Sequence, residues 1–338
     1  MIIIKKVTIK DVARKANVSI STVSNALNGV DVLKPNTKQH ILKVAEELNY
    51  IPNFHGKYLK SNATKILGLF IRSTKGPYYG MLIDAIANEC EKNGYDLNVF
   101  ITKNEKATIN SVLGRSFDGA IIFNEWLSAE SLQLLEKSNI PIIFLDREKT
   151  GKHISSVIFA SYEGGQMVTQ YLADQGHKKI GFIHGVIELY DDKERFRGYR
   201  DALNEKSLVY DENISLFGDF EEDTAYHAVR KFIHSGYELP DAFIAANDLS
   251  AIGCIKAFAA EGYSIPDDIS VIGFDDIEIS SYFQPKITTV RNPIIKQGVL
   301  AVDRLLDIIF NNEGGNLDKL KGEMIIRDSC IANNKKNR

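Results

Sequence analysis

Residues 7–29 read VTIKDVARKANVSISTVSNALNG and contain two short amphipathic helical patterns joined by a tight turn. Thr8 and Asp11 have the spacing of a capping box at the start of the first helix, and Asn17 tolerates the left-handed backbone of a turn. Ser19 can cap the second helix. The side chains expected to face inward from these helices are Val12, Ala13, Ala16, Val23, Ala26 and Leu27.

A third helical pattern follows, with Pro35 in its first turn. Three amphipathic helices around one small core, the first two joined by a tight turn, make a helix-turn-helix unit, whose second helix enters the major groove of DNA. From pattern alone, that helix could equally be a capped amphipathic helix with a solvated polar face. The third helix should face inward with Ile41, Val44, Ala45 and Leu48.

The charge of the chain is unevenly distributed. The net charge of all 338 residues is −3, which taken alone argues against a nucleic-acid partner. Residues 1–62 carry ten lysines and arginines but four acids, a net charge of +6, and the remainder carries −9. A basic head on an acidic body suits a polyanion partner for the head. A basic surface that is merely solvated is the alternative on charge alone.

From Lys65 onward, apolar runs of strand length alternate with helical stretches, which predicts βαβ units and parallel sheets. Too many units occur between Lys65 and Asp276 for one modest sheet, so we expect two doubly wound lobes with a break near Ala160. Their ligand cleft should lie beyond the carboxyl ends of the strands. The runs are ILGLFI, YDLNVFI, DGAIIF, IPIIFLD, KIGFIHG, DAFIAAND and ISVIGFDD.

Several classes of protein are disfavoured. No run of about 18 apolar residues occurs and MIIIKK is too short for a signal peptide, which predicts a cytoplasmic protein with no membrane partner. Cys90, Cys254 and Cys330 are far apart and lie in no CxxC, so we expect reduced cysteines, no metal and no cofactor. No GxGxxG after a strand, P-loop, GxSxG or HExxH indicates an enzyme.

Residues 7–29, followed by AEELNYIPN, resemble the lac repressor (LacI/GalR) family of bacterial transcription regulators. Similar strings continue through most of the chain, including LADQGHKKIGFIHG, FRGYRDAL and AANDLSAIG. The resemblance implies an α/β protein that binds a near-palindromic operator as a homodimer. The expected segments are a helix-turn-helix head (1–52), a hinge helix and linker (53–64), a body like a periplasmic sugar-binding protein (65–330, with lobe N about 65–160 plus 291–321 and lobe C about 161–290 plus 322–330) and a basic tail (331–338).

The family reads bases at the positions of Ile20 and Ser21, and Asn25 aligns where many members have arginine. Arginine prefers guanine and asparagine prefers adenine, and the shorter side chain can also reach no base. We therefore predict an operator that differs from the lac operator at this half-site position. The side chains expected on phosphates, which fix register without reading bases, are Thr8, Ser19, Thr22, Ser24 and Asn28.

The link IPNFHGKYLKSNAT aligns with the segment that forms a hinge helix on operator DNA in this family. Leu59 aligns with the leucine that wedges into a minor-groove step, and Lys60 with a basic neighbour. Gly56 costs about 1 kcal/mol of helix propensity relative to alanine. We therefore predict that the hinge folds only on DNA.

The resemblance also implies an effector site between the lobes. Members that bind flat purines carry a tryptophan where Arg147 stands, which favours a sugar here. Convergent hydrogen-bonding groups between stacking faces suit such a polyhydroxylated ligand. The expected effector residues are Tyr78, Tyr79, Asp146, Arg147, Arg195, Phe220, Asn247 and Asp275.

Structural roles remain open for some of these residues, since Tyr78, Tyr79 and Phe220 could be core aromatics. Asp248 could cap the helix that begins DLSAIG, and Trp126 could line the cleft or pack within a lobe. We expect structural or surface roles for the two histidines that flank one strand, His177 and His184.

Taken together, the residues and the resemblance favour a transcriptional repressor controlled by a small-molecule effector, expected to be a sugar or sugar derivative. A solute-binding protein would fit the body alone. The basic head and the lack of a signal peptide argue against that alternative.

Overall fold

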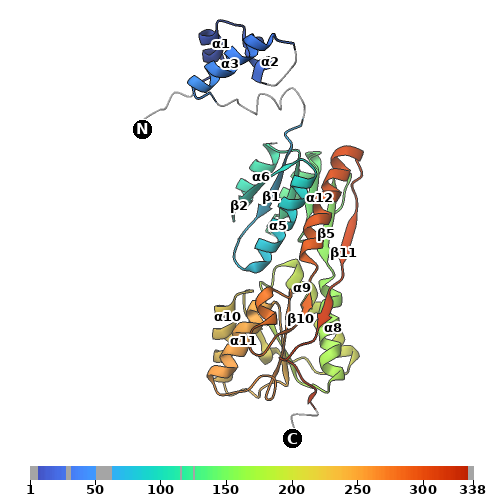
Figure 1. Cartoon of the computed structure of the whole chain (residues 1–338). Coiled ribbons are helices and arrows are strands. Elements are labelled where there is room, and N and C mark those ends of the chain that lie inside the picture. The colour runs from blue at the N-terminus through green and yellow to red at the C-terminus, as the bar shows by residue number, and fades with distance from the viewer. Residues whose placement is uncertain (1–6, 28–31, 51–62, 115, 125, 334–338) are drawn as a thin grey trace. The chain divides into compact units, whose positions relative to one another are not determined.

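The computed structural model describes residues 7–27, 32–50, 63–114, 116–124 and 126–333. Its contacts divide the chain into two compact units, Met1–Thr64 and Lys65–Arg338 (Figure 1). The first unit contains three described helices: α1 (Ile9–Ala16), α2 (Ile20–Leu27) and α3 (Pro35–Glu47).

The head is built as its sequence predicts. The Thr8 backbone N–H and hydroxyl both donate to Asp11 Oδ2, at 2.9 and 2.7 Å, and Asn17 ends α1 with a φ of 54°. Ser19 Oγ accepts the Thr22 backbone N–H at 3.1 Å and so caps α2. All the predicted inward side chains lie in or against one core, whose fully buried members include Val12, Val23 and Ile41. The helix-turn-helix prediction is confirmed.

The body contains two sheets, as predicted, and each has six strands among the described residues. The sheet of lobe N has the order β11-β5-β4-β3-β1-β2, and all its pairings are parallel. Its strands are β1 (Ile66–Ile71), β2 (Asp96–Ile101), β3 (Gly119–Phe123), β4 (Ile142–Phe144), β5 (Ile154–Phe159) and β11 (Leu317–Leu320). Its helices are α5 (Pro77–Lys92), α6 (Glu105–Leu113), α7 (Ala129–Lys137) and α12 (Ile294–Asn311).

The sheet of lobe C has the order β12-β10-β9-β8-β6-β7. Its strands are β6 (Ile180–His184), β7 (Ser215–Phe217), β8 (Ala242–Ala245), β9 (Ser270–Phe274), β10 (Thr288–Arg291) and β12 (Glu323–Ile325). Its helices are α8 (Ser161–Asp174), α9 (Tyr190–Glu205), α10 (Glu222–Ile233), α11 (Asp248–Ala260) and the short 3-10 turns η1 (Glu212–Ile214) and η2 (Glu278–Ser281).

One detail of the predicted fold needs correction. The lobe C sheet is mixed rather than wholly parallel, because β12 pairs antiparallel with β10. The chain crosses from lobe C into lobe N through β10 and α12, adds β11, and returns through β12. Such an antiparallel edge strand comes from this last short return, which needs no crossover helix.

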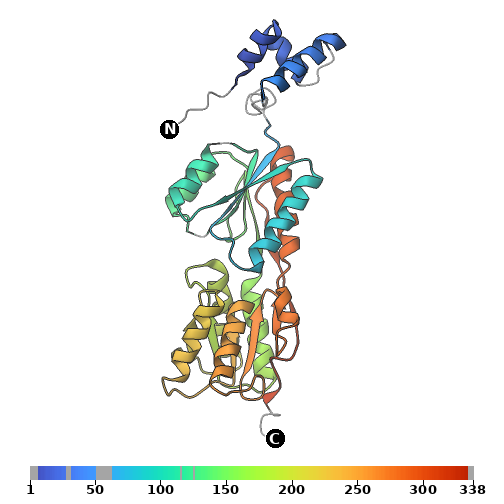
Figure 2. The same cartoon turned by 60° about the vertical axis from the view of Figure 1, so that its left-hand side comes forward.

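Helices cover both faces of each sheet, as buried parallel strands require. In lobe N, α5 and α12 run side by side over one face, and α6 and α7 cover the other (Figure 2). In lobe C, α10 and α11 cover one face and α8 and α9 the other. The strands are therefore fixed from both sides, and the loops at their carboxyl ends are free to form a site.

Candidate effector cavity and DNA-binding face

A cavity of about 570 Å³ lies between the two lobes. Its walls come from segments that follow the carboxyl ends of strands in both lobes, where the alternating pattern predicts a ligand cleft. Six of the eight expected effector residues line it: Tyr78, Tyr79, Arg195, Phe220, Asn247 and Asp275.

Arg195 projects from the second turn of α9 and is 3% exposed. Its Nη1 donates to the Ala246 carbonyl at 2.5 Å, and its Nη2 lies 3.8 Å from Asp275 Oδ1. The guanidinium also lies over the ring of Phe274, at 4.7 Å from the ring centroid. Arg195 is therefore held in place by β8 and β9 before any ligand arrives.

Asp275 follows β9 with a φ of 103°, a backbone conformation that residues other than glycine rarely adopt. Its Oδ1 accepts a hydrogen bond from Asn292 Nδ2 at 2.8 Å. Burial raises the pKa of Asp275, while Arg195 and the Asn292 hydrogen bond oppose the rise. The strained backbone aims a desolvated carboxyl into the cavity, where it can accept a hydrogen bond from a ligand hydroxyl.

Asp248 lies behind this carboxyl at the start of α11, fully buried. Burial and the nearby Asp275 raise the pKa of Asp248 to about 8, against three donors that favour its charged form. The cap of α11 is not Asp248 but Asn247, whose side-chain oxygen accepts the Ser250 N–H at 2.9 Å. The donors to Asp248 are the Thr289 hydroxyl (2.6 Å), the Ser280 hydroxyl (2.7 Å) and the Ile277 backbone N–H (3.0 Å).

Phe220 and Asn247 lie together on the lobe C side of the cavity. Asn247 Nδ2 donates to the Phe220 carbonyl at 3.0 Å, and Phe220 has a φ of 57°. A Cβ on Gly185 would lie 2.2 Å from the Phe220 ring, so a larger residue at that position would displace the ring. The ring therefore rests directly on the backbone that follows β6.

Tyr78 and Tyr79 begin α5 on the lobe N side, and their rings meet edge to face at 5.6 Å. The Tyr78 hydroxyl donates to Gln297 Oε1 at 3.1 Å, and burial raises the Tyr78 pKa well above its usual value. Both rings are half-buried and pack against the lobe N core while lining the cavity. The core role and the cavity role are thus combined in the same side chains.

The structure does not bring Asp146 and Arg147 into the cavity lining. Arg147 Nε and Nη2 each donate at 3.1 Å to the carboxylate of the adjacent Asp146, and Nη2 also donates to the Asn124 carbonyl at 2.7 Å. Burial raises the pKa of Asp146, and Arg147 opposes this shift. Asp146 and Arg147 therefore pair with each other just after β4, and their effector role stays a prediction.

The cavity residues outside the expected effector set include four on the lobe N side: Arg72, Lys75, Lys103 and Trp126. Arg72 directly follows β1 and Lys103 lies two residues after β2. Because ligand sites lie beyond the carboxyl ends of parallel strands, both positions could have been predicted from the sequence. The Arg72 guanidinium lies 4.6 Å from the Trp126 ring centroid. This places Trp126 in the cleft rather than within lobe packing.

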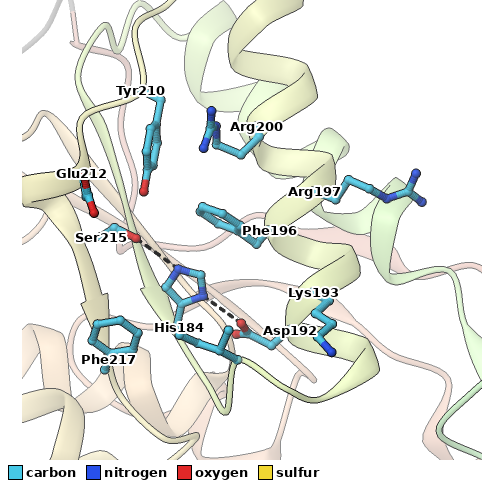
Figure 3. Close-up of a pocket in the computed structure, with 11 residues that line it drawn as sticks. His184, Asp192, Lys193, Phe196, Arg197, Arg200, Tyr210, Glu212, Ser215 and Phe217 are labelled. Carbon is cyan, nitrogen blue, oxygen red and sulfur yellow. Dashed lines mark hydrogen bonds and ion pairs between the residues drawn. The ribbon is translucent and has the colours of Figure 1, made fainter.

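A second cavity, of about 610 Å³, lies in lobe C between α9 and β7 (Figure 3). His184 Nδ1 is 2.7 Å from Asp192 Oδ2, and its Nε2 is 3.1 Å from Ser215 Oγ. Asp192 Oδ1 also accepts the Gly185 backbone N–H at 2.6 Å. His184 thus joins β6, α9 and β7, the structural role expected for it.

On the head, the outward face of α2 is available to a partner. Ile20 is 45% exposed, Ser21 is exposed, and Asn25 is half-buried. Of the residues expected on phosphates, Thr8 and Ser19 are exposed, and Thr22 and Ser24 are half-buried. Asn28, Leu59 and Lys60 lie outside the described residues.

Within the described ranges, no group of three or more His, Cys, Asp or Glu side chains could hold a metal ion. None of the helices in those same ranges is long and apolar enough to cross a bilayer. All three cysteines are buried and form no disulfide, and Cys90 and Cys254 lie inside helices.

A helix-turn-helix head joined to a two-lobed body with an internal cavity defines a DNA-binding protein that responds to a small molecule. The family "Bacterial regulatory proteins, lacI family" matches residues 8–53, and "Periplasmic binding protein-like domain" matches residues 169–330. The chain is 33% identical to the HTH-type transcriptional repressor PurR of Pasteurella multocida (strain Pm70), over 95% of this chain and 98% of that protein. The chain belongs to the lacI family of bacterial transcriptional regulators.

Solved structures agree with this assignment. A lac repressor dimer bound to operator and the anti-inducer ONPF matches with a TM-score of 0.81 and 26% identity, covering 97% of this chain and all of that one. A complex of the transcriptional regulator CelR with cellobiose matches with a TM-score of 0.73 and 25% identity, covering 96% and 100%. The chain is a cytoplasmic DNA-binding repressor with an effector-binding body, and it is not an enzyme.

Proposed function

We propose that the protein represses transcription as a homodimer on a near-palindromic operator, and that a sugar or sugar derivative in the interlobe cavity controls its affinity for DNA. The observation that carries this proposal is the cavity itself. It lies between two lobes, and it presents a preset arginine, a carboxyl and an amide beside aromatic rings. Such a set suits the hydroxyl groups and apolar faces of a carbohydrate.

Control follows from where the cavity lies. A ligand that contacts both lobes stabilises one relative orientation of them, and the effect on DNA equals its difference in affinity between the two orientations. Among the described ion pairs, Lys75 of lobe N and Glu221 of lobe C meet across the cavity at 3.6 Å. A bound effector competes with or reinforces this contact.

An exposed edge of lobe N supports the homodimer. β2 ends the sheet and exposes Val99 (38%) and Ile101 (58%), while Leu113 of the neighbouring α6 is also exposed (38%). A second copy related by a two-fold axis would cover the same edge on both subunits. Ile101→Asp should yield monomers in analytical ultracentrifugation, and an unchanged dimer would show that the interface lies elsewhere.

Operator reading is assigned to Ile20, Ser21 and Asn25 because α2 presents them outward. Selection from random DNA with the purified full chain should return a two-fold symmetric site. Binding should weaken steeply with salt, as phosphate contacts require. Asn25→Ala should relax selection at one half-site position, and an unchanged preference there would mean that Asn25 reads nothing.

Thermal shift across sugars tests the effector. A ligand at 100 times its dissociation constant should stabilise the protein by about 2.7 kcal/mol. Arg195→Lys keeps the charge but not the planar fork, so it should weaken this response while operator binding in the absence of ligand persists. Loss of operator binding as well would show that Arg195 acts mainly in folding.

A further inference from the structure

The two walls of the interlobe cavity differ in charge. Among its described lining residues, lobe N contributes three cations and no acid, whereas lobe C contributes four acids and Arg195. The lobe N cations are Arg72, Lys75 and Lys103, and the lobe C acids are Asp191, Asp219, Glu221 and Asp275.

Arg72 is the group on the cationic wall that lacks partners. It is half-buried, and its Nε is shielded from solvent without a hydrogen-bond partner. Within the described part of the chain its guanidinium forms no ion pair, and it lies against the ring of Trp126. A buried donor left unsatisfied is destabilising, and a ligand oxygen that accepts a hydrogen bond from it would remove that cost.

The two lysines of the lobe N wall differ in whether they have an ion-pair partner. Lys75 is paired with Glu221, but no ion pair is recorded for the exposed Lys103 among the described residues. Arg72 and Lys103 therefore leave a positive end of the cavity that the protein itself does not neutralise. Stacking on Trp126 keeps the planar fork of Arg72 oriented, which suits bidentate binding of a phosphate or carboxylate.

We infer that the effector is an anionic sugar derivative whose phosphate or carboxylate binds Arg72 and Lys103, while its hydroxyl groups face Arg195, Asn247 and Asp275. The inference rests on the proposed function, because it assumes that the interlobe cavity holds the effector. A neutral sugar would fill the lobe C end and leave the Arg72 Nε unsatisfied. The acids of lobe C would also repel the anionic group, which fixes the direction of the ligand.

The test uses Trp126, which is the chain's one tryptophan and lies in the cavity wall. Fluorescence of the full-length protein would be followed during titration with inorganic phosphate and with hexoses and disaccharides, each as the neutral sugar, the phosphate ester and the uronic acid. We expect saturable changes with an anionic form and at least tenfold weaker binding of its neutral parent. A preference for the ester or the uronic acid distinguishes phosphate from carboxylate.

Arg72→Gln should lower affinity for the anionic form about 30-fold or more and leave the neutral parent within about twofold, the loss expected when a charge-assisted bidentate contact is removed. Arg197→Gln is the matched control, since this exposed arginine pairs with Glu194 and lines the second cavity, not the interlobe cavity. Equal binding of neutral and anionic forms, no anion response at all, or an Arg72→Gln protein with unchanged affinity would each overturn the inference.

Failure of the inference and failure of the proposed function give different results. If anionic sugars bind no more tightly than their neutral parents, and Arg195→Lys weakens both forms while Arg72→Gln changes neither, the cavity holds an effector that is not anionic. If neither variant changes the binding of any sugar in the panel, the cavity is not the effector site.

Discussion

The two arginines of the interlobe cavity, Arg195 and Arg72, show how differently its walls are built. Arg195 is buried and held by a carbonyl, a carboxylate and an aromatic ring, all within lobe C. Arg72 lies on lobe N against one ring, with an unsatisfied Nε. The Arg195 Nε also lacks a hydrogen-bond partner, but both Nη atoms of Arg195 lie against polar groups of lobe C, whereas Arg72 has no polar partner among the described residues. Lobe C is therefore the more preorganised wall, and lobe N gains more when ligand arrives.

The largest expected effect follows from deleting each arginine. Arg195→Ala should lower the free energy of unfolding by about 3–5 kcal/mol, because it leaves the buried Asp275 carboxyl without its cation. Arg72→Ala should cost less than about 1 kcal/mol, the loss of one cation–π contact. Urea unfolding followed by circular dichroism measures both. Similar losses for the two variants would break the contrast between the walls.

The second effect is a pH dependence of the free energy of unfolding, caused by Asp248 in lobe C. Because the Asp248 pKa rises from 3.8 to about 8, the folded chain keeps a proton that the unfolded chain has released between these values. The contribution of Asp248 to the free energy of unfolding is therefore complete below pH 3.8. It falls as the pH rises, by up to about 1.4 kcal/mol per pH unit. Unfolding free energies from pH 5 to 8 should show a shallower decline in Asp248→Asn. An unchanged slope would mean that Asp248 is charged in the folded state.

The third effect tests whether the second cavity supports the lobe C wall. Asp192 binds both His184 and the Gly185 N–H, and Gly185 carries the Phe220 ring of the interlobe cavity. Asp192→Asn should lower the free energy of unfolding by about 1–3 kcal/mol and weaken sugar binding through Phe220 and Arg195. Ser215→Ala is the matched control, with a cost of about 1 kcal/mol and no change in sugar binding. If both variants changed sugar binding equally, the network around His184 would not support the effector site.

The sequence predicted the parts of the molecule that follow from periodicity. The buried faces of α1, α2 and α3 were readable because one small core needs apolar residues at helical spacing. The cavity position was readable because parallel strands end at one edge. These features depend on local pattern and chain direction, so no contact between distant residues had to be known.

Side-chain partners could not be read in this way. The mutual ion pair of Asp146 and Arg147 was not predicted, although neighbouring opposite charges can fold onto each other, and their effector role stays a prediction. The side-chain amide of Asn247 caps α11 and donates to the Phe220 carbonyl. Arg72 faces Trp126, which lies 54 positions further along the chain. The antiparallel β12 likewise depends on where the chain returns after α12.

The smallest expected effect concerns Lys75 and Glu221, where the two walls meet. Lys75 is largely exposed (78%) and Glu221 is partly exposed (40%), so their 3.6 Å pair should contribute less than about 1 kcal/mol, and less at high salt. If an anionic effector binds the lobe N wall, Glu221→Gln removes a nearby competing negative charge. Affinity for the anionic form should then rise by up to about fivefold at low salt, while the neutral parent binds unchanged. Titrations at 50 and 300 mM salt measure the difference. A gain that persists at high salt, or one shared by the neutral sugar, would show that Glu221 shapes the cavity and does not act by charge.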